Sequence, residues 1–424
     1  MYYNKGGVQM LVREKVLRDP IHNYIYIQHP VILDLLNCRE FQRLRRIKQL
    51  GTTSYSFHGA EHSRFSHSVG VYEITRQICD LFARNYPSQT TQDGLWNDNE
   101  RLVALCAALL HDIGHGPYSH TFEKIFNTDH EEMTCRIILD KTTQIHQILA
   151  NTDASLPKKV VAVIQKTYPN QQVVQMISSQ LDADRMDYLL RDSYFTGAKY
   201  GTFDLTRILR VMRPYKGGIT FDFEGMHAVE DYIVSRFQMY QQIYFYPVSR
   251  SMEVLLGNLL ARAKDLFLEN KLDDQLTTHF LKPFFAKNEI PLQTYLSLDD
   301  HVLNTCFNIW QTHEDPILSD LAQHFCNRQP FKSLKNTPKN AQKINEIKQA
   351  LKDAKLDKKY YTALNDSYDS PYAVDDAKKK TPITLFKDCD DFVELSNASA
   401  IVNAIRDKQV GDERFFFPKE FSSI

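Results

Sequence analysis

The chain has 424 residues, and its 51 Lys and Arg against 52 Asp and Glu give a formal net charge of −1. With 24% charged and 43% hydrophobic residues, the composition excludes a disordered chain and allows a sizeable core with a second domain. A net charge near zero argues against a protein that coats nucleic acid, so nucleic acid is not an expected partner.

Helical periodicity dominates the first 270 residues, where strand-like alternation is scarce before residue 200. The pattern predicts helices over residues 30–51, 65–84, 100–113, 130–139, 171–192 and 226–268. Asp129 is the expected N-cap of the fourth helix, and Pro247 should break the last one. Gly217-Gly218 predicts a β-hairpin turn.

The sequence changes in character after about residue 270. Helical periodicity continues to about Leu334, and the lysine-dense residues 332–359 are more typical of a solvated helix face than of a nucleic-acid site. Residues 360–424 mix turn residues with short apolar runs. The expected fold is therefore mainly α, with a small hairpin and a C-terminal helical to α+β region, divided into domains 1–270 and 271–424.

Neither a membrane nor an oxidising compartment is indicated. No run of about 18 apolar residues is present, and the first 25 residues lack an apolar signal segment. The seven cysteines (38, 79, 106, 135, 306, 326 and 389) form no CxxC pair, which is typical of reduced thiols. We therefore expect a cytoplasmic protein without a membrane partner.

Histidines are concentrated in one part of the chain. Seven of the 15 fall within residues 58–130, where even spacing would give about three. His111-Asp112 ends the most apolar predicted helix, and burying both groups without a partner would be costly. A divalent cation held by His67, His111, Asp112 and an acid such as Asp184 would offset that cost, although the spacing around Asp184 suits a solvated helix face equally well.

Four motifs occur in order along the chain: RFSHSVG at 64–70, HDIGHGPYSH at 111–120, DHEEMT at 129–134 and DADRMDYLLRD at 182–192. Together they resemble the HD-domain deoxynucleoside triphosphate (dNTP) triphosphohydrolases, over about Val16 to Leu334. The resemblance implies an HD-domain helical core. It also implies hydrolysis of a dNTP to deoxynucleoside and tripolyphosphate.

The resemblance also implies the site. His67, His111, Asp112 and Asp184 would bind one divalent ion: Mn, Mg, Fe, Zn or Ni. His130 would be the general acid, with Glu131 or Glu123 tuning it; His115 would contact the α-phosphate and His120 would lie nearby. The positions expected to bind substrate are Arg64, Arg185 and Arg236 for phosphates, Gln49, Asp192, Tyr188 and Tyr244 for the sugar, and Tyr240 and Phe245 near the base.

Regulation is a further implication of the resemblance. Such enzymes are usually tetramers that respond to a nucleotide effector, GTP or a dNTP, at subunit interfaces. Residues matching effector positions are Lys15, Asn37, Gln42, Arg45 and Arg207. Asp222 and Glu224 replace basic residues there, so we expect a second effector site to be altered or missing. The residues alone leave open an HD phosphohydrolase of another nucleotide, or a non-catalytic nucleotide sensor or nucleic-acid binder.

Overall fold

The computed structural model describes residues 2–3, 9–90, 93–272, 275–286, 289–374, 381–388 and 391–424. Cys389 lies outside these residues, and the other six cysteines are free thiols. In the described parts of the chain, no helix is both long and apolar enough to cross a lipid bilayer.

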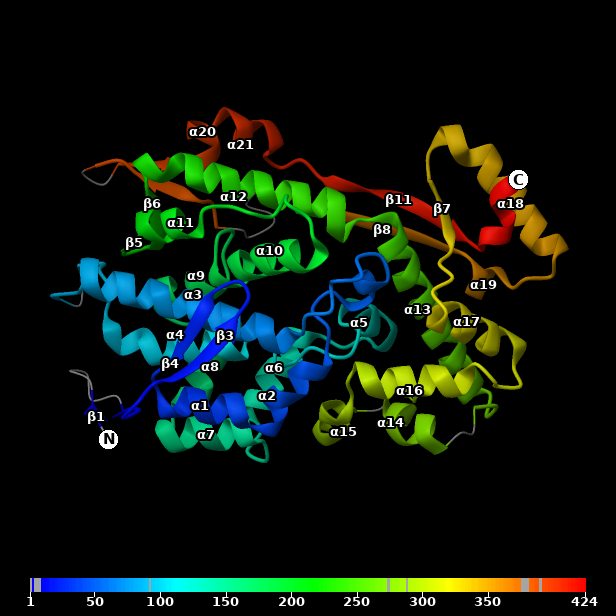
Figure 1. The fold of residues 1–424 in the computed structure, drawn as a ribbon, viewed down its shortest axis with the longest axis horizontal. Helices are drawn as coiled ribbons and strands as arrows, with labels where there is room; N and C mark the ends of the chain where they lie inside the picture. The colour runs from blue at the N-terminus through cyan, green and yellow to red at the C-terminus, as the bar shows by residue number, and fades with distance from the viewer. Residues whose placement is uncertain are drawn as a thin grey trace.

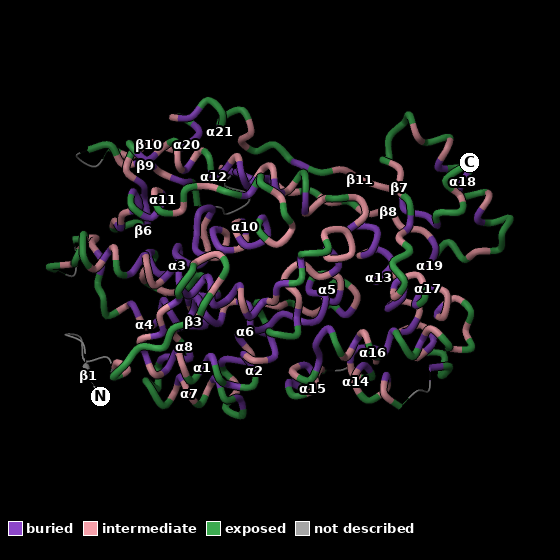
Figure 2. Tube along the Cα trace, in the orientation of Figure 1, coloured by how far each residue is buried: buried purple, intermediate pink, exposed green. Residues whose placement is uncertain are grey.

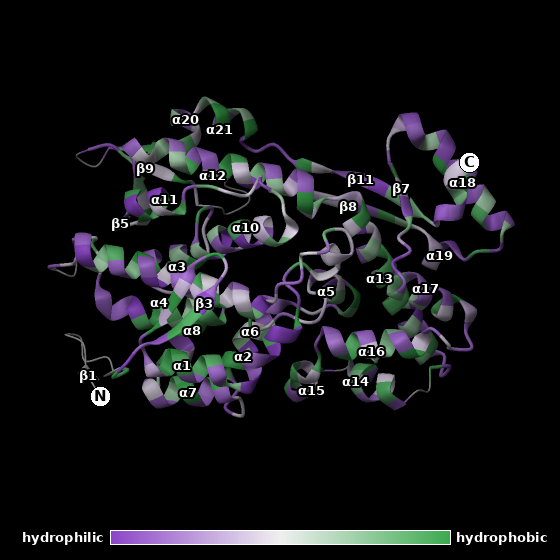
Figure 3. Cartoon of the chain, viewed as in Figure 1, coloured by the Kyte–Doolittle hydropathy of each residue, from purple (hydrophilic) through white to green (hydrophobic). Residues whose placement is uncertain are grey.

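Helix α4 lies at the centre of the N-terminal part of the molecule, where it is buried along almost its whole length between α3, α8 and α9 (Figures 1 and 2). The apolar residues of Figure 3 accordingly gather on the helices around it. In chain order these helices are α1 (Pro30–Asn37), α2 (Arg39–Arg43), α3 (Arg64–Asn85), α4 (Arg101–Leu110), α5 (His120–Phe126), α6 (His130–Leu139), α7 (Gln144–Thr152), α8 (Leu156–Ile164), α9 (Gln171–Ile177), α10 (Ala183–Thr196), α11 (Leu205–Val211), α12 (Met226–Met239) and α13 (Pro247–Leu268).

Two antiparallel hairpins belong to this part. Strands β5 (Met212–Tyr215) and β6 (Gly218–Asp222) form the predicted hairpin at Gly217-Gly218. Strands β3 (Lys15–Asp19) and β4 (Asn23–Ile27) form one that the sequence reading missed, because only a short alternating stretch marks it. A short pair, β1 (Tyr2–Tyr3) with β2 (Gln9–Met10), precedes them.

The C-terminal region packs against α13 and then returns to the N-terminal part. Its helices are α14 (Gln275–Phe285), α15 (Leu292–Ser297), α16 (Asp300–Trp310), α17 (Pro316–Cys326), α18 (Ala341–Asp353), α19 (Lys358–Tyr361), α20 (Leu395–Ala398) and α21 (Ala400–Ile405). Strand β11 (Val410–Phe417) pairs with β7 (Lys332–Lys335) and β8 (Ala363–Asp369), while β9 (Thr384–Phe386) pairs with β6 and with β10 (Phe392–Glu394). The β8–β11 pair runs across the molecule between these contacts (Figure 1).

One hydrophobic core extends from Ile25 to Phe416 and thus crosses the expected boundary at residue 270. A small second core forms where Ile344, Ile347 and Leu351 of α18 pack on β11. Lys348 and Lys352 of α18 are exposed, in agreement with a solvated helix face, and the Lys348 ammonium also lies 5.3 Å from the centre of the Phe415 ring of β11. The fold is mainly α with a C-terminal α+β region, so the predicted fold class is confirmed.

The predicted helix over 171–192 is wrong as a single element. The structure has α9 and α10, separated at residues 178–182. Asp182 causes the restart, because its side chain accepts a hydrogen bond from the backbone N–H of Arg185 at 2.7 Å and caps α10. The break sets Asp184 in the first turn of α10. By contrast, α6 spans the predicted residues, and Pro247 begins α13 as expected.

Candidate metal and nucleotide site

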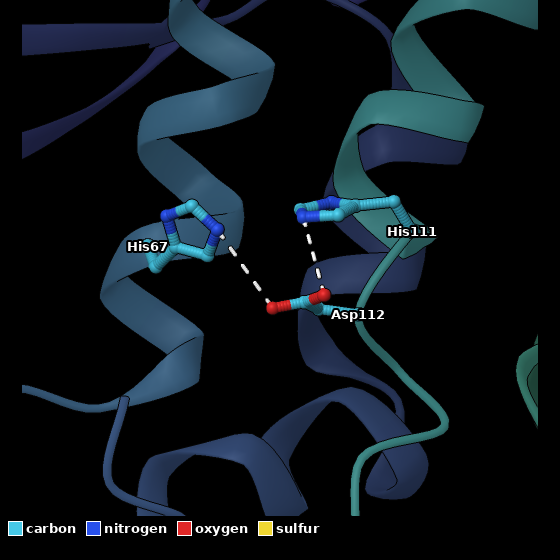
Figure 4. Close-up of side chains that lie close together, drawn as sticks. All are labelled: His67, His111 and Asp112. Carbon is cyan, nitrogen blue, oxygen red and sulfur yellow. Dashed lines mark ion pairs between the residues drawn. The ribbon is translucent and has the colours of Figure 1, made fainter. Parts of the chain in front are cut away.

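Four side chains from three parts of the bundle converge beside α4. His67 lies on α3, His111 and Asp112 follow the end of α4, and Asp184 begins α10. His67 Nε2 lies 3.7 Å from Asp112 Oδ2, and His111 Nε2 lies 3.4 Å from Asp112 Oδ1 (Figure 4). His67 Nε2 also lies 3.1 Å from Asp184 Oδ1. His111 Nε2 is also 3.6 Å from Asp184 Oδ1. The sequence-predicted metal ligands therefore form one cluster.

Local sequence explains how the turn after α4 delivers these groups. Gly114 follows His111-Asp112, and its N–H donates to Thr134 Oγ1 of α6 at 2.9 Å. A Cβ on Gly114 would lie 2.2 Å from the carbonyl oxygen of His130 and 2.3 Å from the nitrogen of Thr134. A side chain at this position would push α6 away, so the glycine brings His130 close to the metal ligands.

The two imidazoles are oriented alike. His67 Nδ1 lies 2.8 Å from Asp187 Oδ2 and His111 Nδ1 lies 2.9 Å from the carbonyl oxygen of Ala108, so each Nδ1 carries the proton. Each Nε2 then directs a lone pair at the carboxylates. His111 Nε2 is buried without a hydrogen-bond partner in the described part of the chain. Because these lone pairs would repel the carboxylates, the donor set fits a cation between them, and imidazole with carboxylate suits Mn, Fe, Ni or Zn.

The electrostatics agree with this fit. Burial lowers the pKa of His67, but hydrogen bonds to Asp184 and Asp187 more than offset burial and raise it to about 10. Burial also lowers the pKa of His111, but the negative charge of Asp112 outweighs burial, so this pKa is raised. The pKa values of Asp112 and Asp184 are lowered, because nearby histidines and, for Asp112, Arg64 outweigh burial. Without a cation the carboxylates therefore favour a proton on Nε2 of each imidazole, and a bound metal ion would take the place of that proton.

A second group of histidines gathers around Glu123 of α5. Glu123 Oε1 lies 3.1 Å from His130 Nδ1 and 3.4 Å from His115 Nδ1, and Glu123 Oε2 lies 3.3 Å from His120 Nδ1. The rings of His115 and His130 are stacked, with centroids 3.9 Å apart. His115 Nε2 is also 3.4 Å from Asp112 Oδ1, which joins this group to the metal ligands.

The stacked rings have opposite tendencies. Burial and the Arg64 charge lower the pKa of His115 to about 4, so its ring is neutral. Burial opposes the charging of His130, but Glu123 outweighs it and raises the pKa of His130. Burial is also outweighed at Glu123, whose pKa the histidines hold well below its usual range. His130 is therefore the ring of this group that is suited to carrying a proton.

Arg64 is held by strained backbone in front of α5. Tyr118 and Ser119 have positive φ angles of 52° and 44°, which are unfavourable for residues other than glycine. This conformation aims Ser119 Oγ at Arg64, which donates to it from Nε at 3.1 Å and from Nη2 at 2.8 Å. Arg64 Nη1 also donates to Asp112 Oδ2 at 2.5 Å. The sequence reading did not identify Ser119.

A cavity of about 600 Å³ extends from these groups toward α10 and the turn that follows α12. At its far end Asp192 accepts a hydrogen bond from the Tyr244 hydroxyl at 2.8 Å and lies 2.7 Å from His62 Nε2. A π-helical turn, Tyr240–Tyr244, carries two aromatic side chains there. The lining includes most of the predicted substrate and catalytic positions: Gln49, Arg64, His115, His120, Glu123, His130, Tyr188, Asp192, Tyr240, Tyr244 and Phe245.

Three predicted site residues have other partners. Glu131 is exposed and lies 3.6 Å from Lys166 Nζ, so the structure does not bring it to the cavity. Arg185 pairs with Asp182 at the start of α10. Arg236 is buried beside the Tyr240 ring, donates to the Pro371 carbonyl at 2.9 Å and lies 3.6 Å from Asp369. Both arginines adjoin tyrosines that line the cavity.

The predicted effector residues fall on two surfaces. Around the α1–α2 junction, Gln42 accepts a hydrogen bond from Arg45 Nε at 2.9 Å and donates to the carbonyl of Leu36 at 2.7 Å, beside Asn37. Lys15 begins β3. Arg207 lies on α11 and donates to the carbonyl of Glu224 at 3.2 Å, while Asp222 pairs with Arg213 at 2.9 Å.

Several residues of the site were not identified from the sequence. Ser119, Lys124, Glu253 and Ser367 line the cavity, while His62 contacts Asp192 and Asp187 orients His67. Motif position could have indicated Asp187, four residues before Arg191 on the same helix face. Ser367 comes from β8, far along the chain, and no local pattern marks it.

Comparisons with known proteins agree with this geometry. The HD domain family model matches residues 64–192, and the HD associated region matches residues 203–282. An uncharacterised protein of Bacillus subtilis, YwfO, is 47% identical over 414 residues, covering 97% of this chain and 93% of its own. A Dictyostelium discoideum protein named deoxynucleoside triphosphate triphosphohydrolase SAMHD1 homolog is 30% identical over 65% of this chain and 54% of its own.

Among solved structures, a phosphohydrolase from Bacteroides thetaiotaomicron superposes with a TM-score of 0.82 at 25% identity, over 96% of this chain and all of that one. The fold is therefore shared over 96% of this chain, which includes most of the region that follows the HD associated region. The match between the family models, the relatives and the clustered His-Asp residues has one reading: this chain belongs to the HD-domain family whose members carry an HD associated region.

Proposed function

We propose that this chain hydrolyses dNTPs to deoxynucleoside and tripolyphosphate in a metal-dependent reaction. The observation that carries the proposal is the cavity that joins a His-Asp cation cluster at one end to the Asp192–Tyr244 pair at the other. A 5′-nucleotide has the matching arrangement, with an anionic chain at one end and a sugar hydroxyl at the other. The relatives named as dNTP triphosphohydrolases support the substrate class.

The metal would be held by His67, His111, Asp112 and Asp184, and when bound it would polarise an α-phosphate oxygen and lower the pKa of a nearby water. Arg64, fixed by Ser119, faces the same region and would offset the phosphate charge. Neutral His115 would lie against the α-phosphate. Arg185 and Arg236 would contact the outer phosphates once they exchange Asp182 and Asp369 for phosphate oxygens.

His130 would supply the proton that the leaving group needs. Its Nδ1 faces Glu123, so Nε2 is available to protonate the 5′-oxygen as the bond between phosphorus and that oxygen breaks. Water adds to the α-phosphorus, which leaves with the outer phosphates as tripolyphosphate, while the protonated 5′-oxygen leaves on the deoxynucleoside. Exposed His120 would then lie at the edge of the reaction centre, and Glu131 has no part in this scheme.

Sugar recognition would come from the far end of the cavity. Asp192, held by His62 and Tyr244, can accept the 3′-hydroxyl, with Gln49 as a second contact. Tyr188 packs edge-on to Tyr244, with ring centroids 6.2 Å apart, so two rings would bound C2′ and disfavour a 2′-hydroxyl. Tyr240 and Phe245 would lie near the base.

Regulation by a nucleotide is part of the proposal. Lys15, Asn37, Gln42 and Arg45 would form an effector surface in a tetramer, supported by Arg45, an exposed cation in the turn after α2. Arg207 would contribute to a second surface, where Asp222 and Glu224 lower the attraction for phosphates. Residues 271–424 would serve assembly and regulation.

The test is a product assay. The purified chain is incubated with each dNTP and Mn²⁺ or Mg²⁺, with and without a second nucleotide, and deoxynucleoside and tripolyphosphate are measured. The expected result is equal amounts of the two products. Release of only orthophosphate or pyrophosphate, or turnover of only monophosphates or cyclic nucleotides, would contradict the proposal and indicate another HD phosphohydrolase activity.

A further inference from the structure

Behind the metal cluster lies a buried carboxylate, that of Asp187, which has several hydrogen-bonding neighbours on both of its oxygens. Asp187 has no exposed side-chain surface. Its Oδ2 faces His67 Nδ1 at 2.8 Å and accepts from Arg191 Nε at 2.9 Å. Its Oδ1 accepts from Arg191 Nη2 at 2.9 Å and lies 2.6 Å from His22 Nε2. These contacts hold the Asp187 carboxylate in one orientation, and the carboxylate in turn fixes the orientation of the His67 ring.

Arg191 and His22 extend these contacts to the N-terminal hairpin. Arg191, fully buried, donates from Nη1 to Asp19 Oδ2 at 2.8 Å and from Nη2 to Asp19 Oδ1 at 3.2 Å. Asp19 Oδ1 also accepts the backbone N–H groups of Ile21 at 2.9 Å and His22 at 3.1 Å. The turn between β3 and β4 is therefore built on the same arginine that holds Asp187.

The packing of α3 reserves space for this arrangement. Gly70 lies one turn after His67, and a Cβ there would lie 1.8 Å from Asp187 Oδ1 and 2.5 Å from Arg191 Nη2. No side chain could be accommodated without moving both groups. Asp19, Asp187 and Arg191 together carry one net negative charge next to His67, which strengthens its Nε2 as a ligand.

We propose that Asp187 is a positioning residue for His67, and that Arg191, His22 and Asp19 link it to the β3–β4 turn, so that the hairpin's position sets the metal affinity. The inference rests on the metal site of the proposed function and deepens it. Lys15, at the start of β3, is a proposed effector residue. An anion bound there would act on the metal site through four side chains rather than through the substrate cavity.

The test measures binding of Co²⁺ to the purified, chelator-treated chain by calorimetry and by the visible absorption spectrum of the complex. Asp187→Asn removes the charge and leaves one acceptor oxygen among several donors, so Co²⁺ affinity should fall about 10- to 100-fold. His22→Gln and Asp19→Asn alter only the hairpin end of the link. Each should weaken Co²⁺ binding severalfold and shift the absorption bands. Thermal melting checks that each variant is folded.

His324→Gln is the matched control, because His324 also pairs with a carboxylate, Asp320 at 3.4 Å, but on α17. It should bind Co²⁺ as the wild type does. Wild-type affinity and spectrum in both folded hairpin variants would overturn the link to the hairpin, and wild-type values in Asp187→Asn would overturn the positioning role. If the wild-type chain itself takes up no Co²⁺, the metal site of the proposed function is wrong.

Discussion

The two histidine groups of the cavity use the same side chain in opposite ways. In the metal cluster, His67 and His111 each donate Nδ1 to a fixed acceptor, and their Nε2 atoms converge on shared carboxylates. In the group around Glu123, the Nδ1 atoms of His115 and His130 converge on one carboxylate oxygen instead. The first arrangement fixes the Nε2 atoms of His67 and His111 in the orientation of metal ligands. The second leaves Nε2 of His130 able to gain and lose a proton.

Burial further separates the ligand imidazoles from His130 and His120, although not from His115, which is 4% exposed. The His67 side chain is 1% exposed and His111 is 10% exposed, whereas His130 is 26% and His120 is 72% exposed. A ligand benefits from exclusion of water, because burial strengthens its interaction with an ion. A proton donor must regain its proton from solvent after each turnover. The difference predicts that changes in the first group affect metal content and changes in the second affect proton transfer.

The largest expected effect is that of Asp184→Ala. This variant removes a carboxylate shared by both ligand imidazoles, so metal affinity should fall by more than about 100-fold, beyond the loss typical of an outer-shell partner. Hydrolysis of dNTPs should fall to background. Elemental analysis of the dialysed protein measures the first effect and the product assay the second. Asp153→Ala, which changes an exposed turn aspartate, is the control. Unchanged metal content would remove Asp184 from the ligand set.

His130→Ala should separate the two groups. Without the proton donor, kcat should fall about 10²- to 10⁴-fold, while metal content and dNTP binding stay at wild-type levels. The product assay should therefore show the loss of turnover, while elemental analysis and equilibrium binding of dNTPs give wild-type values. Normal turnover would show that His130 is not the general acid, and loss of metal would show that the two groups are not independent.

The sequence predicted elements whose ends are fixed by neighbouring residues. Helix α6 begins at His130 because Asp129 caps it, and α13 begins at Pro247 because proline favours the first helical turn. The break before α10 was not predicted, since residues 178–182 contain neither glycine nor proline. There the decisive interaction is the cap from Asp182, and aspartate also occurs within helices.

For the site, the motifs predicted which residues cluster but not what holds them. His62 lies 130 positions before its partner Asp192, and Arg236 lies 135 positions before Pro371, whose carbonyl it contacts. Such pairs depend on the packing of segments that lie far apart in the chain, and they leave no periodic trace in the sequence. The same holds for Asp19 and Arg191, 172 positions apart.

Glu123→Gln should change the pH dependence that distinguishes the second group. Glu123 raises the pKa of His130 despite its burial, so the amide lets that pKa fall. A general acid acts in its protonated form, which exists below its pKa. The alkaline limb of the kcat profile should therefore move to lower pH, with a fall of about tenfold or less at neutral pH and little change in acid. An unshifted limb would show that Glu123 does not set the pKa of the general acid. Altered metal content would show that the two histidine groups are not independent.

The smallest effect should come from a change outside both groups. Tyr244→Phe removes the hydroxyl that donates to Asp192 at 2.8 Å, a hydrogen bond that typically contributes about 0.5–1.5 kcal/mol net. Because Asp192 keeps His62, KM for dNTPs should rise only about 2- to 10-fold, equivalent to that range. Metal content and the alkaline limb should stay at wild-type values, since neither group contacts this hydroxyl. Steady-state kinetics across pH measure all of these quantities. A shifted limb or lost metal would mean that the sugar end is coupled to the chemistry, and the division into ligand and proton-transfer groups would then have to include Asp192.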